Sequence, residues 1–303
     1  MESLAQARVL VTGATGFVGQ HLCRELAARG TITLGLSRSA SRDTLPGEVI
    51  PIAADVTRRA EMIAALKAAR PTHVVHLAAV GATEPFLPIE EARRVNFTGT
   101  THVLEACQAV GIKRFLHVGT AYEHSTATLQ QPHNPYVASK VAAWSFWQNF
   151  IQQHELEAIA LRLYYVYGPH QVHGLIPTAV RAAQRHERFE MTWGEQWRDF
   201  IYISDVIDAL MTALTAPRVC GQTYDIGTGV GLQVKTAVQR IFEITGSHGE
   251  YVLGALDYRP HEEMELIAAP AAAQHDLNWQ ARVQFEEGIA RTIETYRRQV
   301  EEV

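Results

Sequence analysis

The sequence lacks the long apolar segments and the cysteine pairs that are typical of membrane and secreted proteins. No apolar run reaches the ~18–20 residues that a membrane-spanning helix needs. The chain enters its first apolar run at Arg8 with no charged and apolar leader before it, so we expect no signal peptide. Cys23, Cys107 and Cys220 are scattered, which favours a reducing compartment over a disulfide framework. We therefore expect a cytoplasmic protein.

Basic residues are also too few to build a face that binds nucleic acid. The 303 residues contain 27 Lys and Arg against 32 Asp and Glu, a formal net charge of −5. Binding to a phosphate backbone needs a strongly basic surface, so we expect no nucleic-acid partner. Hydrophobic residues make up 47% and charged residues 19% of the chain, a balance that excludes disorder and allows a sizeable core.

Short apolar runs alternate with helical stretches over the first two thirds of the chain. The expected strands are 8–12, 31–36, 49–53, 73–77, 115–118 and 158–163, and the expected helices are 19–29, 60–69, 91–110 and 136–154. Strands that are apolar on both faces and alternate with helices indicate an α/β fold, with a parallel sheet covered by helices. After Gly168 this alternation weakens. We therefore predict a dinucleotide-binding domain over 1–168 and about 199–229, and a smaller, partly inserted substrate lobe over 169–198 and about 230–303.

Three glycines follow the first expected strand at the spacing G-x-x-G-x-x-G. Gly13, Gly16 and Gly19 lie where that strand gives way to a helix. A dinucleotide pyrophosphate needs a tight turn, close approach of the backbone and free N–H groups at a helix N-terminus. The strand before and the helix after supply this context, so the motif predicts a dinucleotide site.

Tyr136 and Lys140 are four residues apart at the start of an expected helix, and therefore share one of its faces. A phenol with a pKa near ~10 is a poor acid or base at neutral pH. A neighbouring ammonium stabilises the phenolate. We therefore expect Lys140 to lower the pKa of Tyr136.

Six motifs in one order resemble the extended short-chain dehydrogenase/reductases, which are nucleotide-sugar epimerases, dehydratases and reductases. They are the glycine motif, His76-Leu77-Ala78-Ala79, Asn96-Phe97-Thr98-Gly99-Thr100, Tyr136-Val137-Ala138-Ser139-Lys140, Arg198-Asp199-Phe200 and Asp225-Ile226-Gly227-Thr228-Gly229. The resemblance implies a Rossmann-type doubly wound sheet and an NAD(P)-dependent enzyme that acts on a nucleotide-sugar. It also implies contacts between the cofactor and Gly13, Thr15, Gly16, Phe17, Val18, Ser37, Arg38, Asp55, Val56, Leu77, Ala78, Ala79, Tyr136, Lys140 and Val166.

The end of the second strand indicates which cofactor is preferred. In dinucleotide folds an acid there holds the 2′-hydroxyl of NAD, whereas a nearby Arg accommodates the 2′-phosphate of NADP. The matching positions here are Ser37 and Arg38, with Arg42 close behind. We therefore favour NADP(H), with NAD(H) possible if the two arginines are solvated loop residues. Asp55 resembles an adenine contact of the family, but could instead cap the next helix.

The resemblance implies that Thr120, Tyr136 and Lys140 are catalytic. The tyrosine exchanges a proton with a sugar hydroxyl or ketone, and the lysine also binds the nicotinamide ribose. The threonine hydroxyl can bond to the reacting oxygen. Asn96 matches a family residue that orders the active-site helix and its water, although a helix cap is the competing interpretation.

The residues after Thr120 distinguish between reactions. Family 4,6-dehydratases have acids directly after the threonine, whereas this chain has Ala121 and Tyr122, so dehydration is disfavoured. Glu123 comes one position later, and is either a catalytic acid or part of a salt bridge.

The resemblance implies substrate contacts from Thr120, Ala121, Tyr122, Tyr165, Arg198 and Arg259. Arg198 and Arg259 match two family arginines that pair with the diphosphate, although surface salt bridges are the alternative. Tyr165 stands where the family usually has an asparagine that contacts the substrate, so the usual sugar pose is in doubt.

Two further expectations concern metal and assembly. His73 and His76 point to opposite faces of a strand, and His170 and His173 lack a third ligand, so we expect no metal. Four aromatic residues, Trp144, Phe146, Trp147 and Phe150, cover more than one side of helix 136–154. This pattern predicts a homodimer formed by helices 91–110 and 136–154.

The function that these features favour is NADPH-dependent reduction of a nucleotide-linked 4-keto sugar. The alternative is an NAD(P)-dependent nucleotide-sugar epimerase. A 4,6-dehydratase and a non-catalytic cofactor sensor are less favoured, the sensor because it need not keep Thr120, Tyr136 and Lys140.

Overall fold

The computed structural model describes residues 4–123, 134–154 and 156–301. The chain packs as two compact units. The first unit contains Met1–Arg162, Ile207–Tyr224 and Ala272–Trp279, and the second contains Leu163–Val206, Asp225–Ala271 and Gln280–Val303. Residues 163–168, 199–206 and 225–229, which we assigned to the dinucleotide-binding domain, thus belong to the second unit, and residues 272–279 belong to the first.

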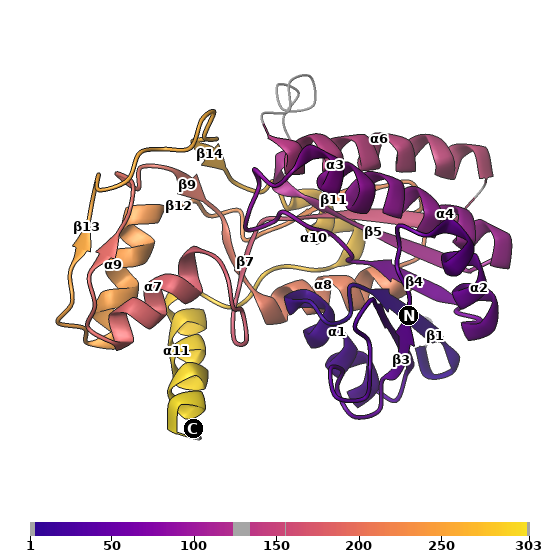
Figure 1. Ribbon diagram of the computed structural model, residues 1–303, viewed down its shortest axis with the longest axis horizontal. Helices are drawn as coiled ribbons and strands as arrows, with labels where there is room; N and C mark the ends of the chain where they lie inside the picture. The colour runs from indigo at the N-terminus through magenta and orange to yellow at the C-terminus, as the bar shows by residue number, and fades with distance from the viewer. Residues whose placement is uncertain (1–3, 124–133, 155, 302–303) are drawn as a thin grey trace. The chain divides into compact units, whose positions relative to one another are not determined.

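A seven-stranded sheet forms the centre of the first unit (Figure 1). In spatial order its strands are β11 (Thr223–Ile226), β6 (Ala158–Leu163), β5 (Arg114–Thr120), β4 (His73–His76), β1 (Arg8–Thr12), β2 (Ile32–Ser37) and β3 (Ile50–Ala53). All pairings from β5 to β3 are parallel. The strand order reverses between β1 and β4, which is the topological switch point where Rossmann-type sheets bind their ligands. The register places Thr12 beside both His76 and Leu36 at the carboxyl edge of the sheet.

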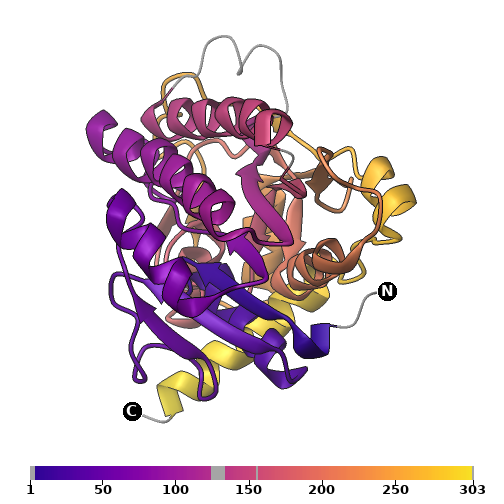
Figure 2. The same cartoon turned by 90° about the vertical axis from the view of Figure 1, so that its right-hand side faces the viewer.

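Helices cover both faces of this sheet, as the alternation in the sequence predicts. They are α1 (Phe17–Ala28), α2 (Arg59–Ala69), α3 (Ile89–Ala92), α4 (Gly99–Val110), α6 (Pro135–His154), α8 (Ile203–Thr215) and α10 (Ala271–Leu277). Figures 1 and 2 show α2, α4 and α6 side by side on one face, with α1 and α8 on the other. Short 3-10 turns lie at Leu4–Gln6 and Ala121–Glu123. The core between the sheet and the α2–α4–α6 layer contains Leu10, Met62, Leu104, Phe115 and Trp147, all fully buried.

The second unit combines three helices with short strand pairs. The helices are α7 (Leu175–Gln184), α9 (Val234–Thr245) and α11 (Phe285–Glu301), and α9 contacts both of the others. Strand β7 (Tyr165–Tyr167) pairs with β10 (Phe200–Tyr202), and β8 (Phe189–Glu190) with β13 (Tyr251–Val252). Strand β9 (Trp197–Arg198) lies between β12 (Leu232–Gln233) and β14 (Glu265–Leu266).

The expected helix 91–110 is not one regular helix. The six-residue π-helical turn Arg93–Thr98 separates α3 from α4. Asn96 lies inside this turn, so its interpretation as a helix cap is wrong. Such wide turns frequently lie at functional sites, and this one turns Asn96 toward the neighbouring helix, as described below.

The aromatic residues of α6 pack inside the chain rather than outside it. Trp147 and Phe150 are buried in the core, and Trp144 and Phe146 are half-buried against it. The homodimer stays a prediction, but much of the aromatic surface that suggested it is covered within one chain. The reason is that α6 packs on α4 and on the sheet at the same time, so aromatic residues on two sides of the helix find partners within one chain. Among the described residues, no helix has the length and apolarity needed to cross a membrane.

Candidate active site

The glycine motif forms a turn that no larger residue could form. Gly13 has a φ of +67°, and a Cβ there would lie 2.8 Å from the backbone nitrogen of Ala78. A Cβ on Gly19 would lie 2.2 Å from the carbonyl oxygen of Gly13. Helix α1 begins directly afterwards, with Gly16 as an N-cap that has no side chain to satisfy the first N–H groups. These free donors and the close backbone approach fit a dinucleotide pyrophosphate.

A buried chain of hydrogen bonds joins the glycine turn to the turn after β4. The backbone N–H groups of Leu77 and Ala78 donate to Thr12 Oγ1. The Thr12 hydroxyl is then left to donate to His76 Nδ1, 2.8 Å away. On the other side of the ring, Thr100 donates to the carbonyl oxygen of Asn96 at 2.6 Å and therefore accepts from His76 Nε2 at 2.9 Å.

The direction of these bonds fixes His76 as a neutral ring with its proton on Nε2. Burial, helped by the charge of Lys140, lowers the pKa of His76 to about 3. A neutral ring can accept on one side and donate on the other, whereas an imidazolium would lose the bond from Thr12. The ring thus holds together the carboxyl ends of β1 and β4, where the glycine turn and the turn after β4 begin.

Asn96 continues this network to the helix that carries Tyr136 and Lys140. Its Oδ1 accepts from the Val80 N–H at 2.8 Å, and its Nδ2 donates to the Val80 carbonyl and the Ser139 hydroxyl, both at 2.9 Å. Ser139 in turn donates to the carbonyl oxygen of Tyr136. The amide of Asn96 is therefore used by the protein itself, and positions the start of α6 directly.

Thr120, Tyr136 and Lys140 lie together in the buried interior of the first unit. Their exposed fractions are 7%, 8% and 5%. A hydrogen bond joins Tyr136 to Thr120, and Lys140 Nζ donates to the Val118 carbonyl at 2.7 Å. Strand β5 supplies Val118 and Thr120, while α6 supplies the other two residues, so the catalytic set that we predicted comes together where a strand and a helix meet.

The expected lowering of the Tyr136 pKa is wrong. Burial raises the pKa of Tyr136 well above its ordinary value, and the hydrogen bond with Thr120 only partly opposes this effect. Burial also lowers the pKa of Lys140, against the influence of Glu123. The phenol therefore remains protonated at neutral pH, because its enclosure outweighs the stabilisation of its charged form.

Glu123 is a fully buried acid beside this set. Its carboxylate lies against Gly119, where a Cβ would come within 2.2 Å of Oε2. Its negative charge raises the pKa values of both Tyr136 and Lys140. Arg162 donates to its carbonyl oxygen at 3.1 Å. Within the first unit, Glu123 thus favours the protonated forms of the phenol and the amine.

The residues assigned to the adenosine end lie at the ends of β2 and β3. Ser37 pairs with Ala53, and Asp55 follows. Burial raises the pKa of Asp55, but a hydrogen bond from Thr57 and the charges of Arg38 and Arg94 bring it below its usual value. Asp55 is not a cap of α2, whose N-cap is Arg58. A cavity of about 420 Å³ lies nearby, lined by Thr15, Gln20, Arg24, Asp43, Thr44, Leu45 and Pro46.

The substrate residues that we expected in the second unit also form a cluster. Arg198 is buried and donates to Glu262 Oε1 at 2.5 Å, and to the Trp197 carbonyl at 2.9 Å. Tyr165 is 38% exposed, and the charges of Arg198, Arg259 and Glu262 act on its hydroxyl. The ion pair of Arg198 is therefore real, but it is buried rather than on the surface. Val166, in β7, is the one expected cofactor residue that belongs to this unit.

Two residues of this cluster escaped sequence reasoning. Glu262, from the sequence Arg259-Pro260-His261-Glu262, balances the charge of Arg198. Asp199 accepts from the backbone of Thr228, Gly229 and Ala268 and from the Thr228 hydroxyl. This explains the pairing of the Arg198-Asp199-Phe200 and 225–229 motifs: the acid of one fixes the turn of the other. The presence of both motifs in the sequence is the signal that could have indicated this contact.

Known proteins resemble this chain in both sequence and structure. The model of the family described as "NAD dependent epimerase/dehydratase family" matches residues 9–227. The dTDP-D-glucose 4,6-dehydratase of Bos taurus is 30% identical, over 96% of this chain and 88% of its own. The CDP-abequose synthase of Salmonella muenchen is 28% identical, over 94% and 97%.

Solved structures with the same architecture include epimerases and proteins that bind a nucleotide-sugar. A structure of MoeE5 in complex with UDP-glucose and NAD is 31% identical, with a TM-score of 0.87 over 96% of this chain and 99% of that one. The UDP-glucose 4-epimerase of Thermotoga maritima, with UDP-glucose, has a TM-score of 0.88 at 25% identity, over 96% and 99%. The chain therefore belongs to the NAD-dependent epimerase/dehydratase family, and is an enzyme of the nucleotide-sugar epimerase/dehydratase type.

Proposed function

We propose that this enzyme reduces a nucleotide-linked 4-keto sugar. The observation that carries the proposal is the buried set of Thr120, Tyr136 and Lys140, followed by Ala121 and Tyr122 where dehydration would need acids. A phenol that stays protonated at neutral pH can give a proton to a ketone oxygen, which is what reduction requires. The relatedness to a CDP-abequose synthase as well as to dehydratases and epimerases is compatible with a reductase.

Each residue has a defined part in this proposal. Tyr136 donates the proton to the carbonyl oxygen of the sugar, and Thr120 donates a hydrogen bond to the same oxygen. Lys140 holds the nicotinamide ribose and restores the proton of Tyr136. The nicotinamide, when bound, supplies the hydride. Arg198 and Arg259 bind the diphosphate, and Tyr165 contacts the substrate beside them.

We propose NADP(H) as the preferred cofactor. Ser37 ends β2 without a carboxylate that would repel a phosphate, and the exposed Arg38 follows it directly. Asp55 follows the next strand, and its charge is already balanced in part by Arg38. The glycine turn and the N-terminus of α1 fit either dinucleotide.

An epimerase is the second candidate, because a UDP-glucose 4-epimerase has the same fold over 96% of this chain. The two functions differ in how the cofactor is held. Mass analysis of the nucleotide that co-purifies with the enzyme, followed by an assay of NADPH oxidation with a nucleotide-linked 4-keto sugar, separates them. We expect an enzyme free of NAD that oxidises NADPH only when the sugar is added. Tightly held NAD and interconversion of sugar epimers without net cofactor oxidation would show the proposal to be wrong.

We also propose a cytoplasmic homodimer. Cys23 and Cys107 are buried free thiols, and burial raises the pKa of Cys23 to about 12, so these thiols are protected rather than paired.

Helices α4 and α6 lie side by side (Figures 1 and 2) and leave the outer side of α6 exposed at Ala142, Ser145 and Asn149. The small side chains of Ala142 and Ser145 would let a second copy approach closely.

A further inference from the structure

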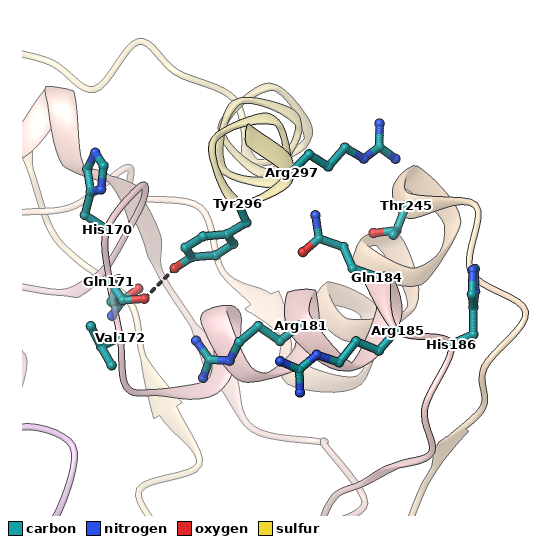
Figure 3. Close-up of a pocket in the computed structure, with 10 residues that line it drawn as sticks. All are labelled: His170, Gln171, Val172, Arg181, Gln184, Arg185, His186, Thr245, Tyr296 and Arg297. Atoms are coloured by element: carbon teal, nitrogen blue, oxygen red, sulfur yellow. Dashed lines mark hydrogen bonds between the residues drawn. The ribbon is translucent and has the colours of Figure 1, made fainter. Parts of the chain in front are cut away.

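The second unit contains a basic cavity that none of the candidate active-site residues lines. Its volume is about 730 Å³. Ten residues line it: His170, Gln171, Val172, Arg181, Gln184, Arg185, His186, Thr245, Tyr296 and Arg297 (Figure 3). Three are arginines and two are histidines, and none carries a carboxylate. The chain as a whole has a net charge of −5, so this concentration of positive charge is local.

Two arginines of this cavity have weaker side-chain partners than another arginine of the same unit. Arg181 lies in the last turn of α7 and Arg185 follows one turn later at the C-cap of the helix, and both side chains line the cavity (Figure 3). The only described side-chain partner of Arg181 is Thr178 Oγ1 at 3.4 Å, and Arg185 is 4.0 Å from Glu187. By contrast, Arg188 lies 3.2 Å from Glu190 and 3.0 Å from Glu250.

Like charges one turn apart destabilise a helix. The negative end of the α7 dipole can compensate for a basic residue in the last turn, and here Arg181 and the following Arg185 both line one cavity. An anion placed between them would make bidentate hydrogen bonds and remove the repulsion.

Two further lining residues, His186 and Gln171, supply a donor and an acceptor. His186 Nδ1 accepts from the backbone N–H of His248 at 3.1 Å, so the neutral ring carries its proton on Nε2 and can donate. Gln171 donates through Nε2 to the Val166 carbonyl, and its Oε1 is buried with no partner in the described part of the chain. Tyr296 donates to the Gln171 carbonyl and fixes this wall of the cavity (Figure 3).

We propose that this cavity binds a small phosphate-bearing molecule that also has hydroxyl groups, of the sugar-phosphate class. The phosphate bonds to Arg181 and Arg185, and a hydroxyl donates to Gln171 Oε1. The volume lies in the range of about 300–1,000 Å³ of small-molecule sites. The site is additional to the proposed substrate site and does not depend on which reaction the enzyme catalyses.

Calorimetric titration of the full-length enzyme with glucose 6-phosphate tests this proposal. The double variant Arg181→Gln/Arg185→Gln should weaken binding at least about tenfold, because it removes charge-assisted hydrogen bonds. The control Arg188→Gln, which removes an arginine of the same unit outside the cavity, should leave the affinity unchanged. Thermal melting of each variant verifies that it is folded.

Two further arms identify the site and the ligand class. The exposed Arg259→Gln should not change the affinity for glucose 6-phosphate; if it abolishes binding while Arg181→Gln/Arg185→Gln does not, the ligand occupies the proposed substrate site and the cavity proposal is overturned. Inorganic phosphate should bind several-fold more weakly than glucose 6-phosphate. Equal affinity would contradict the role of Gln171 and the sugar-phosphate assignment, and no heat of binding for either probe would contradict the site itself.

Discussion

At the scale of single residues, the catalytic proposal ranks three side chains by what each supplies. Tyr136→Phe removes only a hydroxyl, so we expect folding and cofactor binding to persist while kcat falls by roughly 10²–10⁴-fold, the range of general acid–base catalysis. Lys140→Met should reduce both the rate and the affinity for the cofactor. Thr120→Val loses one neutral hydrogen bond, worth about 0.5–1.5 kcal/mol, and should cost roughly tenfold in rate.

Steady-state kinetics with the true substrate checks this order. The decisive comparison is Tyr136→Phe against Thr120→Val, because both variants keep the shape of the side chain. Near-full turnover by Tyr136→Phe would mean that the proton comes from elsewhere. Glu123, buried beside the set, or Tyr122 would then be the next donor to test.

Arg38 decides the cofactor preference at the same scale. If its guanidinium binds the 2′-phosphate, Arg38→Ala should weaken NADPH by roughly tenfold or more, as loss of a charge-assisted hydrogen bond would, and leave NADH nearly unchanged. Fluorescence titration with both cofactors measures this ratio, and Arg42→Ala, which removes the neighbouring arginine of the same loop, is the matched control. A wild-type enzyme that prefers NADH, or equal losses for both cofactors, would contradict the assignment.

At the scale of elements, His76 links two strands and makes their stability depend on pH. Its folded pKa of about 3 lies below that of an unfolded histidine, about 6.5. The unfolded chain therefore binds the proton more readily, and the free energy of unfolding should fall as pH drops below about 6.5. Each such histidine lowers the free energy of unfolding by about 1.4 kcal/mol for each pH unit below that point. His117, which is also buried with a lowered pKa, adds a second contribution of this kind.

Urea unfolding between pH 7 and pH 5 measures this slope. The variant His76→Asn should be less stable at pH 7. Its free energy of unfolding should also change less steeply with pH, by about the 1.4 kcal/mol per pH unit that one proton contributes. His275→Asn, at a histidine whose side chain is 89% exposed, should leave the slope as it is in the wild type. An unchanged slope in His76→Asn would show that His76 titrates normally in the folded state.

Much of the fold follows from local sequence patterns. Strands Arg8–Thr12 and Ala158–Leu163 have the bounds that the apolar runs predict, because buried parallel strands leave a continuous signal. The glycine turn follows for a similar reason: only glycine allows the observed approach to Ala78. The π-helical turn around Asn96 does not follow, since its bonds to Val80 and Ser139 connect residues far apart in the chain. The pKa of Tyr136 was mispredicted because residue spacing carries no information about burial.

At the scale of the whole molecule, the homodimer rests only in part on the aromatic residues of α6, because Trp147 and Phe150 are buried within one chain while Trp144 and Phe146 are half-buried. It rests also on the exposed small residues Ala142 and Ser145 of that helix. Sedimentation at micromolar concentration should show a dimer. Ser145→Arg places a long charged side chain on the exposed side of α6, and should give a monomer with an unchanged melting temperature.

The matched control places the same side chain on a different helix. Gln239 on α9 is exposed and one turn from Glu243, so Gln239→Arg gains an ion-pair partner and should not alter assembly. If the Ser145→Arg variant is still a dimer, the interface does not lie on the exposed side of α6. A wild-type monomer would mean that the two units of a single chain bury all the apolar surface that the fold requires, and that the half-buried Trp144 and Phe146 need no second copy.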